Sequence, residues 1–218
     1  QGSDSATVGL FTYPVLQAAD ILAHDANIVP VGEDQRQHIE LTRDLATRFN
    51  QRYGPVFTVP EVTVMEGAAK IFDLQNPTAK MSKSGESPAG ILWLLDEPAA
   101  LTKKIKSAVT DTDNSIVFDP ENKPGVSNLL SLLALATGKP VSALAEDLSG
   151  GGYGALKGEV AEAVVAKVTP IREKTHELLA DPAELDRLLA VGADKAAETA
   201  EATVGRAHEA LGLLPRLH

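Results

Sequence analysis

The sequence predicts an α/β protein, with a partial parallel sheet in residues 1–89 and an all-helical domain in residues 90–218. Two observations lead to this prediction. Residues 27–65 contain short β-branched runs bounded by glycine and proline, with one helical segment between them, as the strands of a parallel sheet require. Beyond Pro88 the segments are rich in alanine and leucine, which is typical of helices that pack on one another.

Composition narrows the classes of function. The 218 residues are 44% hydrophobic and can build a core, and the absence of cysteine excludes disulfides and thiolate-bound metals, as in a cytoplasmic protein. A net charge of −10 argues against binding nucleic acid through bulk charge, so an RNA partner must meet a local basic patch. No apolar run of about 18 residues occurs, so we expect no membrane partner.

The first expected helix begins at Pro14, because the missing N–H of proline costs nothing in a first turn, and it ends near Asp25. Tyr13, Gln17 and Asp20 follow the spacing that places a phenol, an amide and a carboxylate on one helix face. We expect this face to form a pocket wall. The alternative is that Asp20 is solvated or caps a local backbone group.

Residues 27–32 predict a strand that ends in a glycine, and Glu33–Gln35 opens a second helix. In open α/β sheets, ligands bind beyond the carboxyl ends of the strands, which is the position of Gly32 to Gln35. Two further strands are expected at residues 56–59 and 62–65, where β-branched residues dominate.

A short cationic loop follows. Lys80 and Lys83 lie three residues apart, beside the hydroxyls of Ser82 and Ser84 and just before Gly85. Lysine is a compact charge on a flexible stem, so two of them on one loop can follow the oxygens of a polyphosphate. The alternative is an ordinary solvated turn, in which lysine and serine are common.

The rest of the chain predicts helices. Proline at residue 170 is expected to kink the longest of them, and Gly192 to divide the last segment, which begins at Asp181 and Pro182. Residues 110–119 and 149–154 are expected to be connections. The expected helical segments are residues 91–95, 99–109, 125–136, 141–148, 155–179 and 182–210.

The sequence Lys80-Met81-Ser82-Lys83-Ser84 resembles the signature loop of class I aminoacyl-tRNA synthetases. With Gly67–Ile71 and Val31–Glu40 as further matches, the chain from about Val8 to Leu213 resembles the tryptophanyl-tRNA synthetases. The resemblance implies that the sheet is the later half of a Rossmann-type nucleotide-binding domain and that the helical domain contacts the tRNA anticodon. The His-Ile-Gly-His motif of the family is absent, so we expect the first third of such a protein to be missing and this fragment to be inactive alone.

The family joins tryptophan to the α-phosphate of ATP, releases pyrophosphate and passes the aminoacyl group to tRNA(Trp). The resemblance therefore implies L-tryptophan, ATP as its Mg²⁺ complex and tRNA(Trp) as partners, a homodimer in the complete protein, and no protein-bound metal. Lys80 and Lys83 would be the electrostatic catalysts. The implied ATP-binding residues are Gly32, Glu33, Asp34, Ile71, Lys80, Met81, Ser82, Lys83 and Ser84.

For the amino acid, the resemblance implies that Asp20 accepts the indole N–H and that Tyr13 and Gln35 reach the ammonium group. Gln17, where the family commonly has methionine, Val29 and Val31 complete the implied tryptophan-binding set. A carboxylate would accept equally well from a tyrosine phenol, so hydrogen bonding alone does not separate the two amino acids. The sequence of residues 31–40 resembles that of the enzymes for tryptophan and therefore favours tryptophan.

The competing hypothesis is a non-catalytic module, in which the helical residues bind RNA or protein and the partial sheet is a scaffold. Its best evidence is the basic patch of Lys103, Lys104 and Lys106 on one expected helix. Three lysines on a helix are more often a solvated face.

Overall fold

The computed structural model describes residues 7–64, 70–83 and 87–214. The chain packs as two compact units, one formed by residues 1–68 with 183–218 and the other by residues 69–182. The change in composition near residue 89 therefore does not coincide with the packing boundary. The Lys80 loop belongs to the second unit, together with most of the helices that follow it in the sequence.

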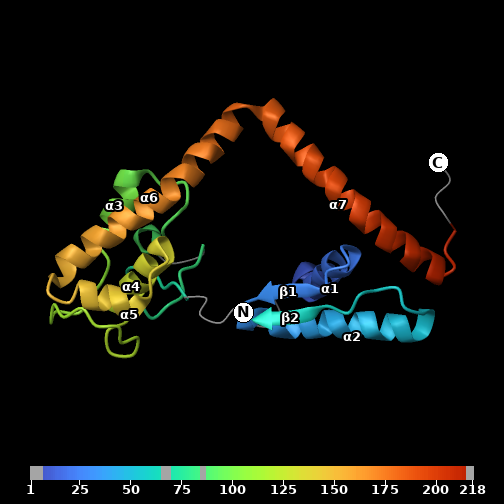
Figure 1. Ribbon diagram of the computed structural model, residues 1–218, viewed down its shortest axis with the longest axis horizontal. Helices are drawn as coiled ribbons and strands as arrows, with labels where there is room; N and C mark the ends of the chain where they lie inside the picture. Colours follow the sequence, from blue (N-terminus) through green and yellow to red (C-terminus); the bar gives the residue numbers. More distant parts are fainter. Residues whose placement is uncertain (1–6, 65–69, 84–86, 215–218) are drawn as a thin grey trace. The chain divides into compact units, whose positions relative to one another are not determined.

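The first unit contains the expected parallel sheet. Strands β1 (Ile28–Val31) and β2 (Glu61–Val64) pair in parallel, with Ile28 opposite Glu61. They are joined by the short helix η2 (Glu33–Gln35) and by α2 (Arg36–Tyr53), which runs alongside the strands (Figure 1). Strand, glycine turn, helix and strand thus follow the predicted order, which confirms the α/β class.

Two more helices complete this unit. Helix α1 (Val8–Ala23) packs against α2, and α7 (Pro182–Ala210) is tied to the end of α1 by an ion pair of 2.6 Å between Arg206 and Asp25. Asp25 also accepts a hydrogen bond of 2.9 Å from the Thr58 hydroxyl. One carboxylate therefore joins α7 and the segment before β2 to the end of α1.

Helix α1 begins six residues before the predicted start at Pro14. Thr7 is its N-cap, and the Thr7 hydroxyl accepts from the backbone N–H of Leu10 at 3.3 Å. Pro14 lies inside the helix and leaves the carbonyl of Leu10 without its helical partner. The prediction was wrong because a threonine cap supplies the helix start that proline was expected to supply.

Residues 56–59 are not a strand, contrary to the prediction. The Asn50 side chain accepts from the N–H groups of Val56 and Phe57, at 3.0 and 2.9 Å, and donates to the carbonyl of Phe57 at 2.7 Å. The ring of Phe57 packs on Phe49, with centroids 4.8 Å apart. Backbone groups that a sheet would need are thus bound by one side chain of α2. The strand expected at 62–65 is confirmed for the described part of β2.

The second unit consists mainly of helices, and α4 supplies many of the residues of its hydrophobic core. Helix α6 packs against both α3 and α4 (Figure 1). Its helices are α3 (Pro98–Lys106), α4 (Pro124–Thr137), α5 (Val141–Asp147) and α6 (Gly152–Ala180), with a single turn, η3, at Pro88–Gly90. The most buried core residues are Leu74, Ile105, Val126, Leu129, Leu130, Leu156 and Val160.

Two expectations about the helices were wrong. Residues 91–95 are not helical: the carbonyl of Ile91 accepts from Lys104 Nζ at 2.8 Å and the N–H of Trp93 donates to Asp96 at 3.1 Å. Helix α7 continues through Gly192 without a break. A single glycine costs a helix about 1 kcal/mol, which the other residues of a long helix outweigh.

In the part of the chain that the structure describes, no single helix is long and apolar enough to cross a membrane. Taken together, α4 and α5 reach the length and composition of a span, but they are bent by 110° at the break between them.

Candidate functional site

The predicted amino-acid face lies on α1 in the first unit. Tyr13, Gln17 and Asp20 all lie in α1, and their spacing places the three side chains on one face of the helix, as expected. Tyr13 and Asp20 are exposed, and Gln17 is half-buried. Asp20 is accessible to a ligand. Its role as acceptor for an indole stays a prediction.

A hydrogen-bonded chain joins this face to the start of α2. The Tyr13 hydroxyl lies 3.0 Å from Nε2 of His38, and Nδ1 of His38 lies 2.9 Å from Oε1 of Gln35. The Tyr13 and His38 rings meet edge to face, 5.3 Å apart. The amide nitrogen of Gln35 in turn donates to Asp34 at 3.4 Å. Sequence reasoning missed His38, although its spacing of three from Gln35 across a helix start could have indicated it.

The carboxyl end of β1 leads into this network. Val29 and Val31 are the half-buried residues of β1 and share one face of the strand, whereas Pro30 points the other way and is exposed. Gly32 follows, and its carbonyl accepts from the N–H of Gln35 at 2.9 Å. The turn that was expected to approach a ligand thus lies at the carboxyl end of the strand. The side chain of Glu33 lies outside the described residues.

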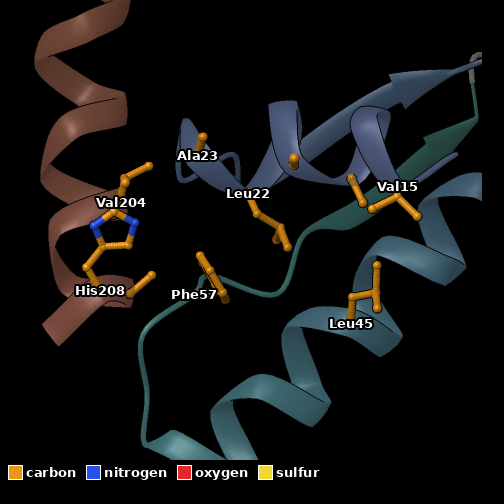
Figure 2. Close-up of a pocket in the computed structure, with 10 residues that line it drawn as sticks. Val15, Leu22, Ala23, Leu45, Phe57, Val204 and His208 are labelled. Carbon is orange, nitrogen blue, oxygen red and sulfur yellow. The ribbon is translucent and has the colours of Figure 1, made fainter. Parts of the chain in front are cut away.

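An apolar cavity of about 350 Å³ lies elsewhere in the same unit. Figure 2 shows Leu22 of α1, Leu45 of α2 and Val204 of α7 around it. Residues 15, 18, 19, 22 and 23 of α1 line the cavity, and at 100° per residue they lie opposite the face of Tyr13, Gln17 and Asp20. The cavity is therefore separate from the predicted amino-acid face.

The cationic loop is carried by a hairpin-like segment of the second unit. The N–H of Met81 donates to the carbonyl of Ile71 at 3.0 Å, and the N–H of Asp73 donates to the carbonyl of Ala79 at 2.9 Å. Phe72 and Lys80 form an antiparallel bridge. Ile71 and Met81 pack against the hydrophobic core, so the loop is anchored at its base.

The charged part of this loop faces solvent. The side chains of Lys80, Ser82 and Lys83 are exposed, which leaves both ammonium groups accessible to an anion. Ser84 lies outside the described residues. The ATP-binding residues predicted on this loop therefore lie together within the second unit, and those at the end of β1 lie together within the first. A site shared by the two sets stays a prediction.

Three buried features hold the base of the loop. The Asn128 side chain of α4, 3% exposed, bonds to both backbone groups of Phe72. The Asp73 carboxylate, 8% exposed, accepts from the N–H groups of Gln75 and Asn76 at 2.7 and 3.0 Å. A Cβ at Gly90 would lie 2.0 Å from this carboxylate, so a larger residue there would displace the Asp73 side chain.

The lysine patch of α3 is divided in its roles. Lys104 is bound within the unit, where its ammonium donates to Asp96 at 2.6 Å and to the carbonyl of Ile91 at 2.8 Å. Lys103 and Lys106 are exposed. Only two of the three lysines thus face solvent, which weakens the competing hypothesis of a basic RNA-binding patch.

A polar cluster joins residues 110–119 to α4 and α6. Lys123 forms ion pairs with Asp111, at 3.2 Å, and with Asp113, and it lies 3.1 Å from the Tyr153 hydroxyl. The hydrogen bond from Lys123 holds the pKa of Asp113 far below its usual range. Burial and a hydrogen bond to Asp111 raise the pKa of Tyr153 to about 12. Among residues 7–64, 70–83 and 87–214, no three acidic or histidine side chains gather as metal ligands would.

Comparisons with known proteins place these features in context. A family model described as tRNA synthetases class I (W and Y) matches residues 1–169. Tryptophan–tRNA ligase 2 of Streptomyces avermitilis is 58% identical over 218 residues, which is 100% of this chain and 65% of that protein. The chain thus spans slightly less than two thirds of the length of this curated relative.

Solved structures give the same result. The crystal structure of tryptophanyl-tRNA synthetase from Mycoplasma pneumoniae is similar with a TM-score of 0.80 at 35% identity, covering 95% of this chain and 64% of that one. The synthetase from Campylobacter jejuni, complexed with ADP and tryptophan, has a TM-score of 0.74 at 38% identity, covering 96% and 64%. The partial sheet and the helices that follow it are therefore an arrangement that longer proteins also contain.

Proposed function

Because this chain belongs to the family of class I tRNA synthetases for tryptophan and tyrosine, we propose that it is part of a tryptophan–tRNA ligase. The observation that carries the proposal is the 58% identity, along the whole chain, to a tryptophan–tRNA ligase. The whole protein would join L-tryptophan to ATP and then transfer the aminoacyl group to tRNA(Trp).

In the first reaction a carboxylate oxygen of tryptophan attacks the α-phosphorus of ATP, and the bond to the β,γ-pyrophosphate breaks. The carboxylate is already ionised, so this step needs no general base, and catalysis consists of alignment and stabilisation of charge on the phosphate oxygens. Lys80 and Lys83 would supply that stabilisation from the exposed loop. ATP would enter as its Mg²⁺ complex.

The anchored base of the loop supports this role. Ile71 and Met81 are held against the core, whereas the two lysines beyond them are exposed. An ammonium on a flexible stem can then follow the phosphate while the backbone beneath it stays in place. Gly32, Glu33 and Asp34, at the carboxyl end of β1, would contact the adenosine side of ATP.

The amino acid would bind against α1 and β1. Asp20 would accept the indole N–H, Tyr13 and Gln35 would bind the ammonium, and Val29 and Val31 would face the ring. Tryptophan is favoured over tyrosine by the relatives: the Campylobacter jejuni structure holds ADP and tryptophan. The whole protein would act as a cytoplasmic homodimer, in which the helical residues 90–218 contact tRNA.

The decisive experiment adds to this chain the part of its relative that the chain does not match. These 218 residues, joined to the part of the Streptomyces avermitilis relative that they do not cover, form what we call the joined protein. We expect it to catalyse ATP–pyrophosphate exchange that depends on L-tryptophan and not on L-tyrosine. Exchange with tyrosine alone, or with neither amino acid while the intact relative is active, would disprove the proposal.

A further inference from the structure

We propose that His38 is a positioning residue for the ammonium group of the amino acid. It would orient the Tyr13 hydroxyl so that its oxygen presents hydrogen-bond acceptors to the ligand. The proposal rests on the proposed function, since it takes tryptophan as the ligand. It arises from the chain of hydrogen bonds that joins Asp34, Gln35, His38 and Tyr13.

The direction of this chain starts at Asp34. A carboxylate only accepts hydrogen bonds, so the group of Gln35 that faces Asp34 at 3.4 Å must be its amide nitrogen. The amide oxygen of Gln35 then faces Nδ1 of His38, at 2.9 Å. An amide oxygen also only accepts, so Nδ1 of His38 must carry the hydrogen.

The second nitrogen of His38 sets the Tyr13 hydroxyl. In a neutral imidazole with its hydrogen on Nδ1, Nε2 is an acceptor. Nε2 lies 3.0 Å from the Tyr13 oxygen, so the hydroxyl must donate its one hydrogen to the ring. The Tyr13 oxygen is then left with lone pairs only, and the hydroxyl cannot turn a hydrogen toward the ligand.

This outcome suits an ammonium group, which offers three donors and no acceptor. A freely rotating hydroxyl would lose entropy on becoming an acceptor, whereas one already bound to His38 is prepared in advance. Tyr13 is 43% exposed, and His38 is half-buried with its ring nearly perpendicular to that of Tyr13. His38 itself need not touch the ligand.

The tautomer can be measured without any activity assay. Long-range ¹H–¹⁵N correlation spectra of the 218-residue chain at neutral pH report which nitrogen of each histidine carries hydrogen, and His38→Phe identifies the His38 signal by its loss. We expect Nδ1 of His38 to be protonated and Nε2 to be a bare acceptor. A hydrogen on Nε2, or on both nitrogens, would overturn the proposed direction of the relay.

Its use for the ligand is measured in the joined protein by calorimetry with two ligands, L-tryptophan and indole-3-propionate, which lacks the ammonium. We expect His38→Phe to weaken tryptophan binding about tenfold or more, as for a hydrogen bond to a charged group, and to leave indole-3-propionate binding nearly unchanged. His176→Phe, at an exposed histidine of α6, is the matched control and should change neither affinity.

The outcomes separate the two proposals. Equal weakening of both ligands by His38→Phe would mean that the ring only shapes the fold, and would overturn the positioning role. No tryptophan binding by the joined protein without substitutions would instead disprove the proposed function and the ligand role with it. The tautomer measurement would in that case still decide the direction of the hydrogen bonds.

Discussion

The side chain of Asn128 pairs with the backbone of Phe72 as a neighbouring strand would. Its Oδ1 accepts from the Phe72 N–H at 2.9 Å, and its Nδ2 donates to the Phe72 carbonyl at 2.8 Å. Because Phe72 bridges to Lys80, this residue of α4 supports the base of the cationic loop. One amide thereby couples the helical core to the loop that the proposed function depends on.

We predict that Asn128→Ala destabilises the protein by about 2–4 kcal/mol, because it leaves the N–H and the carbonyl of the half-buried Phe72 without their partner. Urea unfolding followed by circular dichroism measures the change. Asn76→Ala is the control, since Asn76 is an exposed residue of the same hairpin-like segment and should cost less than about 0.5 kcal/mol. Equal effects of the two substitutions would contradict the structural role of Asn128.

Gly90→Ala should destabilise the second unit by about 1–3 kcal/mol, as overpacking does, because the new Cβ would displace the Asp73 carboxylate and the turn that it caps. Gly158→Ala in α6 is the matched control, since nothing lies within 4 Å of its added Cβ. That change should stabilise by about 0.5–1 kcal/mol. Thermal unfolding compares the two, and a neutral Gly90→Ala would refute the close contact.

The raised pKa of Tyr153, about 12, predicts an alkaline loss of stability. An unfolded tyrosine ionises near pH 10, so between about pH 10 and pH 12 the folded protein binds the proton that the unfolded chain has lost. The contribution of Tyr153 to the free energy of unfolding is therefore lost as the pH rises through this window and is constant below it. Tyrosinate absorbance and urea unfolding at several pH values measure both effects.

The control for this prediction compares two tyrosines. Tyr153→Phe should remove the late-titrating tyrosine and make the alkaline fall in the free energy of unfolding smaller, leaving the part that the raised pKa of Lys123 contributes. Tyr53→Phe, at an exposed ring, should remove an ordinary tyrosine and leave that dependence in place. A late titration that survives Tyr153→Phe would assign it to another residue.

Lys83→Ala in the joined protein should lower the rate of adenylate formation by about 10²–10³, because its charge acts on the phosphate in the transition state. Tryptophan affinity should stay the same, since the ammonium of Lys83 would not contact the indole. Lys103→Ala, at an exposed lysine of α3, should change neither quantity. Rapid-quench measurement of adenylate gives the rate, and a parallel loss of rate and tryptophan affinity would remove Lys83 from this role.

Asp20→Asn should have the opposite profile. An amide can turn a donor toward the indole N–H, so tryptophan affinity should fall by about tenfold or more while ATP affinity persists. Equilibrium dialysis with each ligand measures both affinities in the joined protein. Unchanged tryptophan affinity would make Asp20 a solvated helix residue, which was the alternative reading of this exposed carboxylate.

Structural elements and motifs that depend on residues close together in the chain were predicted from the sequence. The strand ending at Gly32, the helix after Gln35 and the helices of the second unit follow from local spacing, because backbone hydrogen bonds within a helix connect residues four apart. The signature Lys80-Met81-Ser82-Lys83-Ser84 likewise led to the synthetase family before any packing was known. Such signals fail where a side chain from elsewhere takes over the backbone, as Asn50 does at Val56 and Phe57.

Contacts between distant residues were decided only by the tertiary structure. His38 meets Tyr13 across 25 positions and Asn128 meets Phe72 across 56, and neither spacing corresponds to a period of helix or strand. Which polar groups meet depends on how whole elements pack, since each buried donor or acceptor must find a partner among whatever the packing brings near. The sequence by itself therefore determined most of the elements and the family, whereas packing determined which side chains orient the predicted site residues.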